Sequence, residues 1–255
     1  MSMAIDALRL GVVQALSEDP VIAGIVADRV LDSRMAAYSD GEPVPIISVY
    51  TEEDAGEPWS ANNGGPSWDT TVDLVLEIMF QTRALSETNE PLIGIAETNR
   101  ETEALLNLLR TRCEHVIAAG DSPWSLLLRR HVIRRVTETN SKRFRTDDAA
   151  TKAALRLVTL KVQIKCDEDD DPVTPATGPF AALPNPLRAI CEAMPEGSSG
   201  LAACSLLNTA MEVGSGNAPA PFEGMDMLIR PGPKPRPSPT DGAEFGAAAN
   251  TEETP

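Results

Sequence analysis

Two segments in which apolar and polar side chains alternate constrain the fold more than any other feature of the chain. Residues 71–81 (TVDLVLEIMFQ) carry, at every second position, Val72, Leu74, Leu76, Ile78 and Phe80. Residues 156–166 repeat the pattern with Val158, Leu160, Val162, Ile164 and Cys166. Successive side chains of a strand point to opposite faces, so each segment predicts a strand with one apolar face that must be covered.

Helical signals precede and separate these strands. Apolar side chains recur at helical spacing in the first segment, at Ile5, Leu8, Val12, Val13 and Leu16. Asp19-Pro20 fits an N-cap followed by proline at the first position of a short second helix. Residues 98–119 form the main predicted helix, which Gly120 ends. A shorter helix is expected after Asp121-Ser122-Pro123.

The remaining regular segments, residues 44–50 and 132–139, are rich in β-branched side chains and predict two further strands. The fold class is therefore α+β. We expect an antiparallel or mixed sheet of about four strands packed against two or three helices, with an irregular Pro-rich C-terminal extension.

Composition sets the expected domain boundaries. Residues 1–166 form the α+β domain, and the acidic run Asp167–Asp171 predicts an acidic linker over residues 167–172. Residues 173–230 form an extension whose helical fragments, 187–194 and 201–211, are too short to be stable alone. Residues 231–255 form a Pro-rich mobile tail. The helical fragments dock either on the first domain or on a neighbouring subunit. Because Pro184, Pro186 and Pro195 interrupt them, we expect a draped strap in which roughly residues 180–230 become ordered only on assembly, so a chain truncated after Asp171 should stay folded.

A loop of about twenty residues, 51–70, is expected between the first two long strands, and compact domains rarely keep so long a loop without a purpose. It contains Trp59 and Trp68 among acidic, Asn and Gly residues. Two interpretations stay open: the tryptophans are docking points for another protein, or they fold back onto the parent sheet.

Charge and cysteine usage exclude several classes of protein. The net charge is −16, of which residues 167–255, with 14 acidic and 4 basic side chains, carry −10. So acidic a chain is a poor general binder of nucleic acid. No apolar run approaches the ~20 residues of a membrane span, and no signal peptide is evident, so a cytosolic product is expected. Cys113, Cys166, Cys191 and Cys204 lack paired spacing and are expected to be buried free thiols.

The motifs of catalysis and cofactor binding are missing from the sequence. The two histidines, His115 and His131, fall on different predicted elements with no nucleophile signature beside them. No phosphate-binding glycine loop is present. The acidic run Asp167–Asp171 lacks the spaced oxygens and the glycine of a calcium loop. We expect no enzyme activity, no cofactor and no metal.

One basic cluster stands out in this acidic chain. Its members are Arg129, Arg130, Arg134, Arg135, Lys142, Arg143 and Arg145, opposed only by Glu138. Three interpretations stay open: a solvated strand and turn with salt bridges inside the subunit, a surface for an acidic protein neighbour, or a rim that faces DNA phosphates.

The order of these elements resembles the tail terminator (tail-completion) proteins of long-tailed bacteriophages and related gene-transfer-like particles. The resemblance covers about residues 3–166. It rests on the segments IDALRLGVVQAL, EDPVIAGIV, VPIISVY, TVDLVLEIMF, VIRRVTETN and LRLVTLKVQIK. The C-terminal third has no counterpart in this layout.

The resemblance implies a structural virion protein at the head-proximal end of the tail, made in the host cytoplasm. It would form a homo-hexameric ring that stops tube growth and contacts the tail tube protein on one side and a head-completion or connector protein on the other. Double-stranded DNA would pass through the lumen without sequence recognition. The loop after Tyr50 would correspond to a hairpin directed toward the tube. The alternatives are another connector component, such as a head-completion or stopper protein, or a cytosolic enzyme or small-ligand-binding protein.

Overall fold

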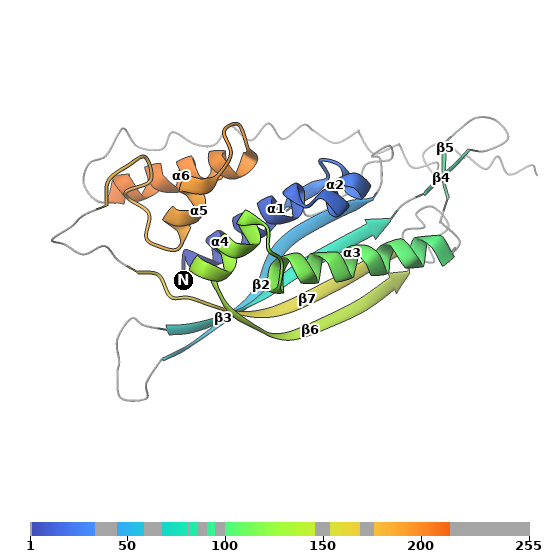
Figure 1. Ribbon diagram of the computed structural model, residues 1–255, viewed down its shortest axis with the longest axis horizontal. Coiled ribbons are helices and arrows are strands. Elements are labelled where there is room, and N and C mark those ends of the chain that lie inside the picture. Colours follow the sequence, from blue (N-terminus) through green and yellow to red (C-terminus); the bar gives the residue numbers. More distant parts are fainter. Residues whose placement is uncertain are drawn as a thin grey trace, which may run out of the picture. The chain divides into compact units, whose positions relative to one another are not determined.

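The computed structural model describes residues 2–33, 45–58, 68–80, 82–85, 91–94, 100–145, 154–168 and 176–214. All of them lie in one compact unit, Met1–Ala218. Its described part contains six helices and a mixed five-stranded sheet, so the fold is α+β, as the sequence predicts (Figure 1).

The main sheet has the strand order β1-β2-β3-β7-β6. Its strands are β1 (Val30–Asp32), β2 (Ile46–Pro58), β3 (Trp68–Phe80), β7 (Ala154–Ile164) and β6 (Ile133–Arg145). β1 pairs parallel to β2, and the other three pairings are antiparallel. A separate two-stranded sheet joins β4 (Thr82–Leu85) to β5 (Pro91–Gly94). The predicted strand at 132–139 is too short, because β6 continues to Arg145. The second half of this strand has no apolar alternation that would predict it.

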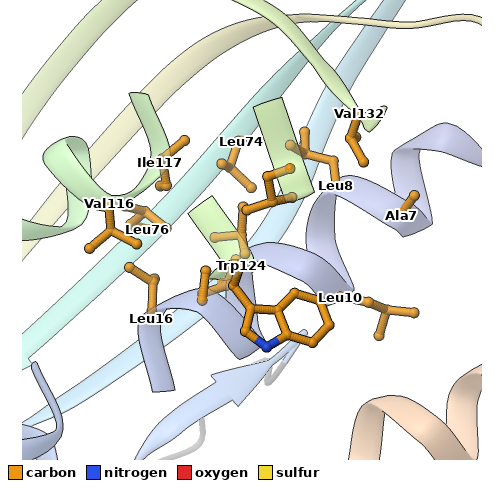
Figure 2. Close-up of a cluster of buried hydrophobic side chains, with 14 of the residues drawn as sticks. Ala7, Leu8, Leu10, Leu16, Leu74, Leu76, Val116, Ile117, Trp124 and Val132 are labelled. Atoms are coloured by element: carbon orange, nitrogen blue, oxygen red, sulfur yellow. The ribbon is translucent and has the colours of Figure 1, made fainter. Parts of the chain in front are cut away.

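Helices cover one face of the main sheet, and the alternating strands supply the other half of the core (Figure 2). These helices are α1 (Ala4–Glu18), α3 (Arg100–Ala118) and α4 (Pro123–His131). Leu74 and Leu76 of β3 are fully buried against them, as the alternation predicts. Trp124 of α4 is buried in the same cluster, and its indole N–H donates to Glu18 at 2.9 Å.

The start of α2 (Pro20–Val26) confirms the predicted Asp-Pro signal. The Asp19 carboxylate accepts hydrogen bonds from the backbone N–H groups of Val21 and Ile22, both at 3.1 Å. Arg112 of α3 also donates to both carboxylate oxygens. Burial would raise the pKa of Asp19, but the hydrogen bonds from Arg112 and Ile22 outweigh it and lower the pKa. One buried carboxylate therefore begins α2 and ties it to α3.

The C-terminal segment belongs to this core, contrary to the expected strap. Leu183, Leu187 and Ile190 are fully buried and pack in the same cluster as α1. They lie in or just before α5 (Leu187–Ala193), which is followed by α6 (Ser199–Gly214). Gly11 makes the close approach possible, because a Cβ there would lie 3.3 Å from Ile190 Cδ1 and 2.7 Å from Leu128 Cδ2.

The beginning of the expected acidic linker is part of the domain as well. The Asp167 carboxylate accepts hydrogen bonds from the N–H groups of Met3 and Ala4, both at 2.8 Å, and so caps the N-terminus of α1. Glu168 forms a β-bridge with Asn185. Two residues of the acidic run therefore connect β7 to α1 and to the C-terminal segment. Residues 169–175 lie outside the described part.

Two of the four cysteines contradict the expectation of free thiols. Cys191 of α5 and Cys204 of α6 form a disulfide with a Cα–Cα distance of 5.5 Å. No spacing signature marks this pair, because the two helices bring together residues 13 apart in sequence. Cys113 of α3 is a buried thiol, and burial raises its pKa.

Candidate interaction surface

β2 is exposed over a continuous stretch at the outer end of the β2–β3 hairpin, from Glu52 to Pro58. The two strands stay paired as far as Pro58 opposite Trp68, so the expected loop 51–70 is wrong over residues 51–58 and 68–70. These residues carry no apolar alternation, and the backbone ladder with β3 makes them a strand. Residues 59–67, with Trp59, lie outside the described part, as does the side chain of Trp68.

The edge of this hairpin is open because β1 is short. β1 pairs with β2 only along residues 47–49, and a bulge between Thr51 and Asp54 follows. Every side chain from Glu52 to Pro58 is exposed, which means that neither face of β2 is covered there. Four of these side chains are acidic: Glu52, Glu53, Asp54 and Glu57. Among the described residues, none of the four has an ion-pair partner.

The sheet face turned away from the helices is charged at the hairpin end and apolar toward the other end. At the hairpin end it forms a hollow of about 480 Å³ between the hairpin, β7 and β6. Its charged lining comprises Glu53, Asp54, Glu57, Asp69, Asp73, Arg135 and Lys161. At the opposite end, Ile46, Val75 and Met79 are buried although they face away from the helices. The open part of this face is therefore charged and has an excess of acids.

The basic cluster of the sequence does not form one patch. Neighbouring side chains of β6 point to opposite faces, so Arg143 lies opposite Arg156 on the helix side while Lys142 lies opposite Leu157 on the outer face. Arg129 lies on α4 and donates to the carbonyls of Ala118 and Gly120 at the C-terminal end of α3.

Most side chains of the basic cluster make contacts within the subunit. Arg134 pairs with Asp69 at 2.5 Å, and Arg143 pairs with Glu103 at 3.4 Å. Arg135 donates to Gln163 at 2.8 Å. Arg130, Arg135 and Lys142 have no carboxylate partner among the described residues, and the side chain of Arg145 lies outside that part. The interpretation as salt bridges inside the subunit accounts for Arg134 and Arg143, and Arg129 and Arg135 are held by neutral acceptors.

Arg156 is a buried charged residue that the sequence does not single out. Its side chain is 2% exposed, on the apolar face of β7, with Asn107 and Glu103 of α3 as its hydrogen-bond partners. Burial and the neighbouring charge of Arg143 lower its pKa. The burial of Arg156 could have been inferred from the strand alternation, because Arg156 lies two residues before Val158 and therefore on the same face as Val158 and Leu160.

Neither a metal site nor a membrane span occurs among the residues that the structure describes. No three His, Cys, Asp or Glu side chains come together in a way that would hold an ion. No helix there combines the length and the apolar character needed to cross a bilayer.

Comparison with known proteins adds no relative. A scan against protein-family models and a search of curated proteins both find no match to this chain.

Proposed function

We propose that this chain is a structural virion protein that caps the tail tube at the head–tail junction, as a hexameric ring through which the genome passes. The β2–β3 hairpin carries the proposal, because its side chains from Glu52 to Pro58 are exposed on both faces. A hairpin of this kind follows Tyr50, where the resemblance to tail terminators places the segment directed toward the tube. The order of helices and strands around it supports the same proposal.

The charges of the hairpin end suit a passage for DNA. Acids outnumber bases in the hollow formed by the hairpin, β7 and β6. Excess negative charge repels phosphate groups, so a duplex would slide past such a surface without binding to it. In the proposed assembly the tail tube protein contacts the hairpin, and a head-completion or connector protein contacts the opposite side of the ring.

The two tryptophans of the hairpin give a test in assembling particles. In particles made without this chain we expect overlong tubes that are not joined to heads. The double variant Trp59→Ala/Trp68→Ala should show the same defect, because a buried aromatic anchor often supplies much of an interface's binding free energy. Tube length and head attachment are measured by electron microscopy, after the unfolding midpoint of the purified variant is shown to equal that of the wild type.

A matched control is Leu126→Ala, an exposed apolar residue (52% exposed) that belongs to α4 and not to the hairpin strands. This variant should cap tails normally. Normal capping by the double tryptophan variant would refute the docking role of the tryptophans. Tails of normal length joined to heads in the complete absence of the chain would refute the proposed function itself.

A further inference from the structure

Two edges of the main sheet have no partner strand among the described residues. One is β6, the last strand in the order β1-β2-β3-β7-β6. The other is formed by the short strand β1 and, beyond Thr51, by β2, where β1 no longer runs beside it. An unpaired edge presents a row of backbone N–H and C=O groups, so it can pair with a strand of another chain.

The two open edges carry opposite charges. The β2 edge presents Glu52, Glu53, Asp54 and Glu57, all of them exposed. β6 carries five basic side chains and one acidic side chain, Glu138. Arg135 near its beginning and Arg130 at the end of α4 have no carboxylate partner among the described residues. Within one subunit β3 and β7 lie between the two edges, so the backbone of the β2 edge can pair with the backbone of β6 only between two copies.

The register places the two edges at the same level. Ala55 of β2 is opposite Thr71, Thr71 is opposite Gln163, and Gln163 is opposite Arg135. A rotation about an axis parallel to the strands keeps every residue at its level. Such a rotation brings the acidic edge of one copy beside the basic beginning of β6 in the next.

The strand directions fit as well. β2, β3, β7 and β6 alternate in direction, so β6 runs antiparallel to β2. A copy related by that rotation keeps the direction of its β2. The new pair would therefore be antiparallel, like the three long pairings inside each subunit.

We propose that the free edge Glu52–Pro58 of one copy pairs with β6 of a second copy near Arg135. The contact is heterologous, so its repetition generates a ring if the rotation closes. The ring itself rests on the function proposed above, and the present inference names the surfaces that form it.

Cysteine trapping tests the contact directly. Ala55→Cys and Arg135→Cys place thiols on the two edges at residues that the register puts at the same level, opposite each other in the new pair. A mixture of the two single variants should form a cross-linked dimer under mild oxidation, either free in solution or on assembled tail tubes. Each variant alone should not, and a cross-link of Ala55→Cys with itself would overturn the proposal in favour of an isologous contact.

Charge reversal provides the second test. The variants Glu52→Lys/Glu53→Lys/Glu57→Lys and Arg130→Glu/Arg135→Glu should each associate about 10- to 100-fold more weakly than the wild type, measured from the concentration dependence of the molar mass by light scattering. An equimolar mixture of the two should recover association, since each basic hairpin then meets an acidic β6. Unchanged association of both charge-reversal variants would overturn the proposal.

The results separate the two proposals. A sixfold ring at the head–tail junction without the predicted cross-link, in solution or on tubes, would refute this interface and leave the function standing. The predicted cross-link and charge rescue in a chain absent from particles would support the interface and refute the function.

Discussion

A chain that ends after Asp171 is expected to lose cooperative folding. The truncation removes Leu183, Leu187 and Ile190, which are fully buried against the first helix and its neighbours. Burial of each such side chain contributes roughly 1.5–3 kcal/mol, and domains are stable by only about 5–15 kcal/mol in total. Urea unfolding followed by circular dichroism should show a broad transition or none at all.

The matched control is a chain that ends after Ala218, which keeps the whole compact unit. It should unfold at the same urea concentration as the full-length protein. A chain ending after Asp171 that unfolds at that same midpoint would show that α5 and α6 are dispensable for the core.

Replacing Asp19 should have the second largest effect on stability. Asp19→Ala removes both the N-cap of α2 and the partner of Arg112, whose guanidinium lies 2.7 Å from the carboxylate. Loss of a cap costs about 1 kcal/mol, and loss of a hydrogen bond to a charged group costs about 1.5–3 kcal/mol. The free energy of unfolding should fall by roughly 3 kcal/mol.

Asp19→Asn separates the two contributions, because asparagine also caps helices while it carries no charge. It should cost less than Asp19→Ala. If the two variants are equally stable, the side chain does not act as a cap.

The pH dependence of the same variant tests the ion pair. The pKa of Asp19 is lower in the folded protein than its ordinary value, so its ionised form stabilises the fold above the ordinary aspartate pKa of about 3.9. This stabilisation is lost as the pH falls through the lowered pKa. The difference in unfolding free energy between wild type and Asp19→Asn should therefore be constant at neutral pH and decrease below about pH 4.

Much of the fold follows from local sequence signals. The alternation in residues 71–81 identifies β3 because one face of that strand is buried along Val72, Leu74, Leu76 and Ile78. The Asp19-Pro20 signal identifies α2 because the cap forms within a few residues. In both cases the sequence pattern and the stabilising contact lie in the same segment.

The errors concern contacts between distant segments. The C-terminal helices are interrupted by prolines at Pro184, Pro186 and Pro195, which suggests a strap. In the structure, however, Gly11 allows Ile190 to approach α1 closely and to pack against it. No local pattern reveals that fit. Local patterns do not reveal the strand at 51–58 either, because its pairing depends on the backbone of β3 and its side chains from Glu52 to Pro58 are all exposed.

The candidate site shows the same division. A run of basic residues from Arg129 to Arg145 is evident in the sequence, but strand alternation and contacts with Asp69 and Glu103 distribute it over two faces. The complementary acidic edge lies on β2, which becomes level with Arg135 only through the register of β3 and β7. The sequence predicts which segments are acidic and which are basic. Only the strand order of the sheet shows that these charges lie at two open edges.

A reconstruction of the head–tail junction from purified particles, with this chain carrying a label, tests the proposed function most directly. We predict the label in a closed sixfold ring between the tail tube and the connector, with the β2–β3 hairpin of each copy directed at the tube. A lone copy, a non-cyclic arrangement, or a label found elsewhere in the particle would contradict the account.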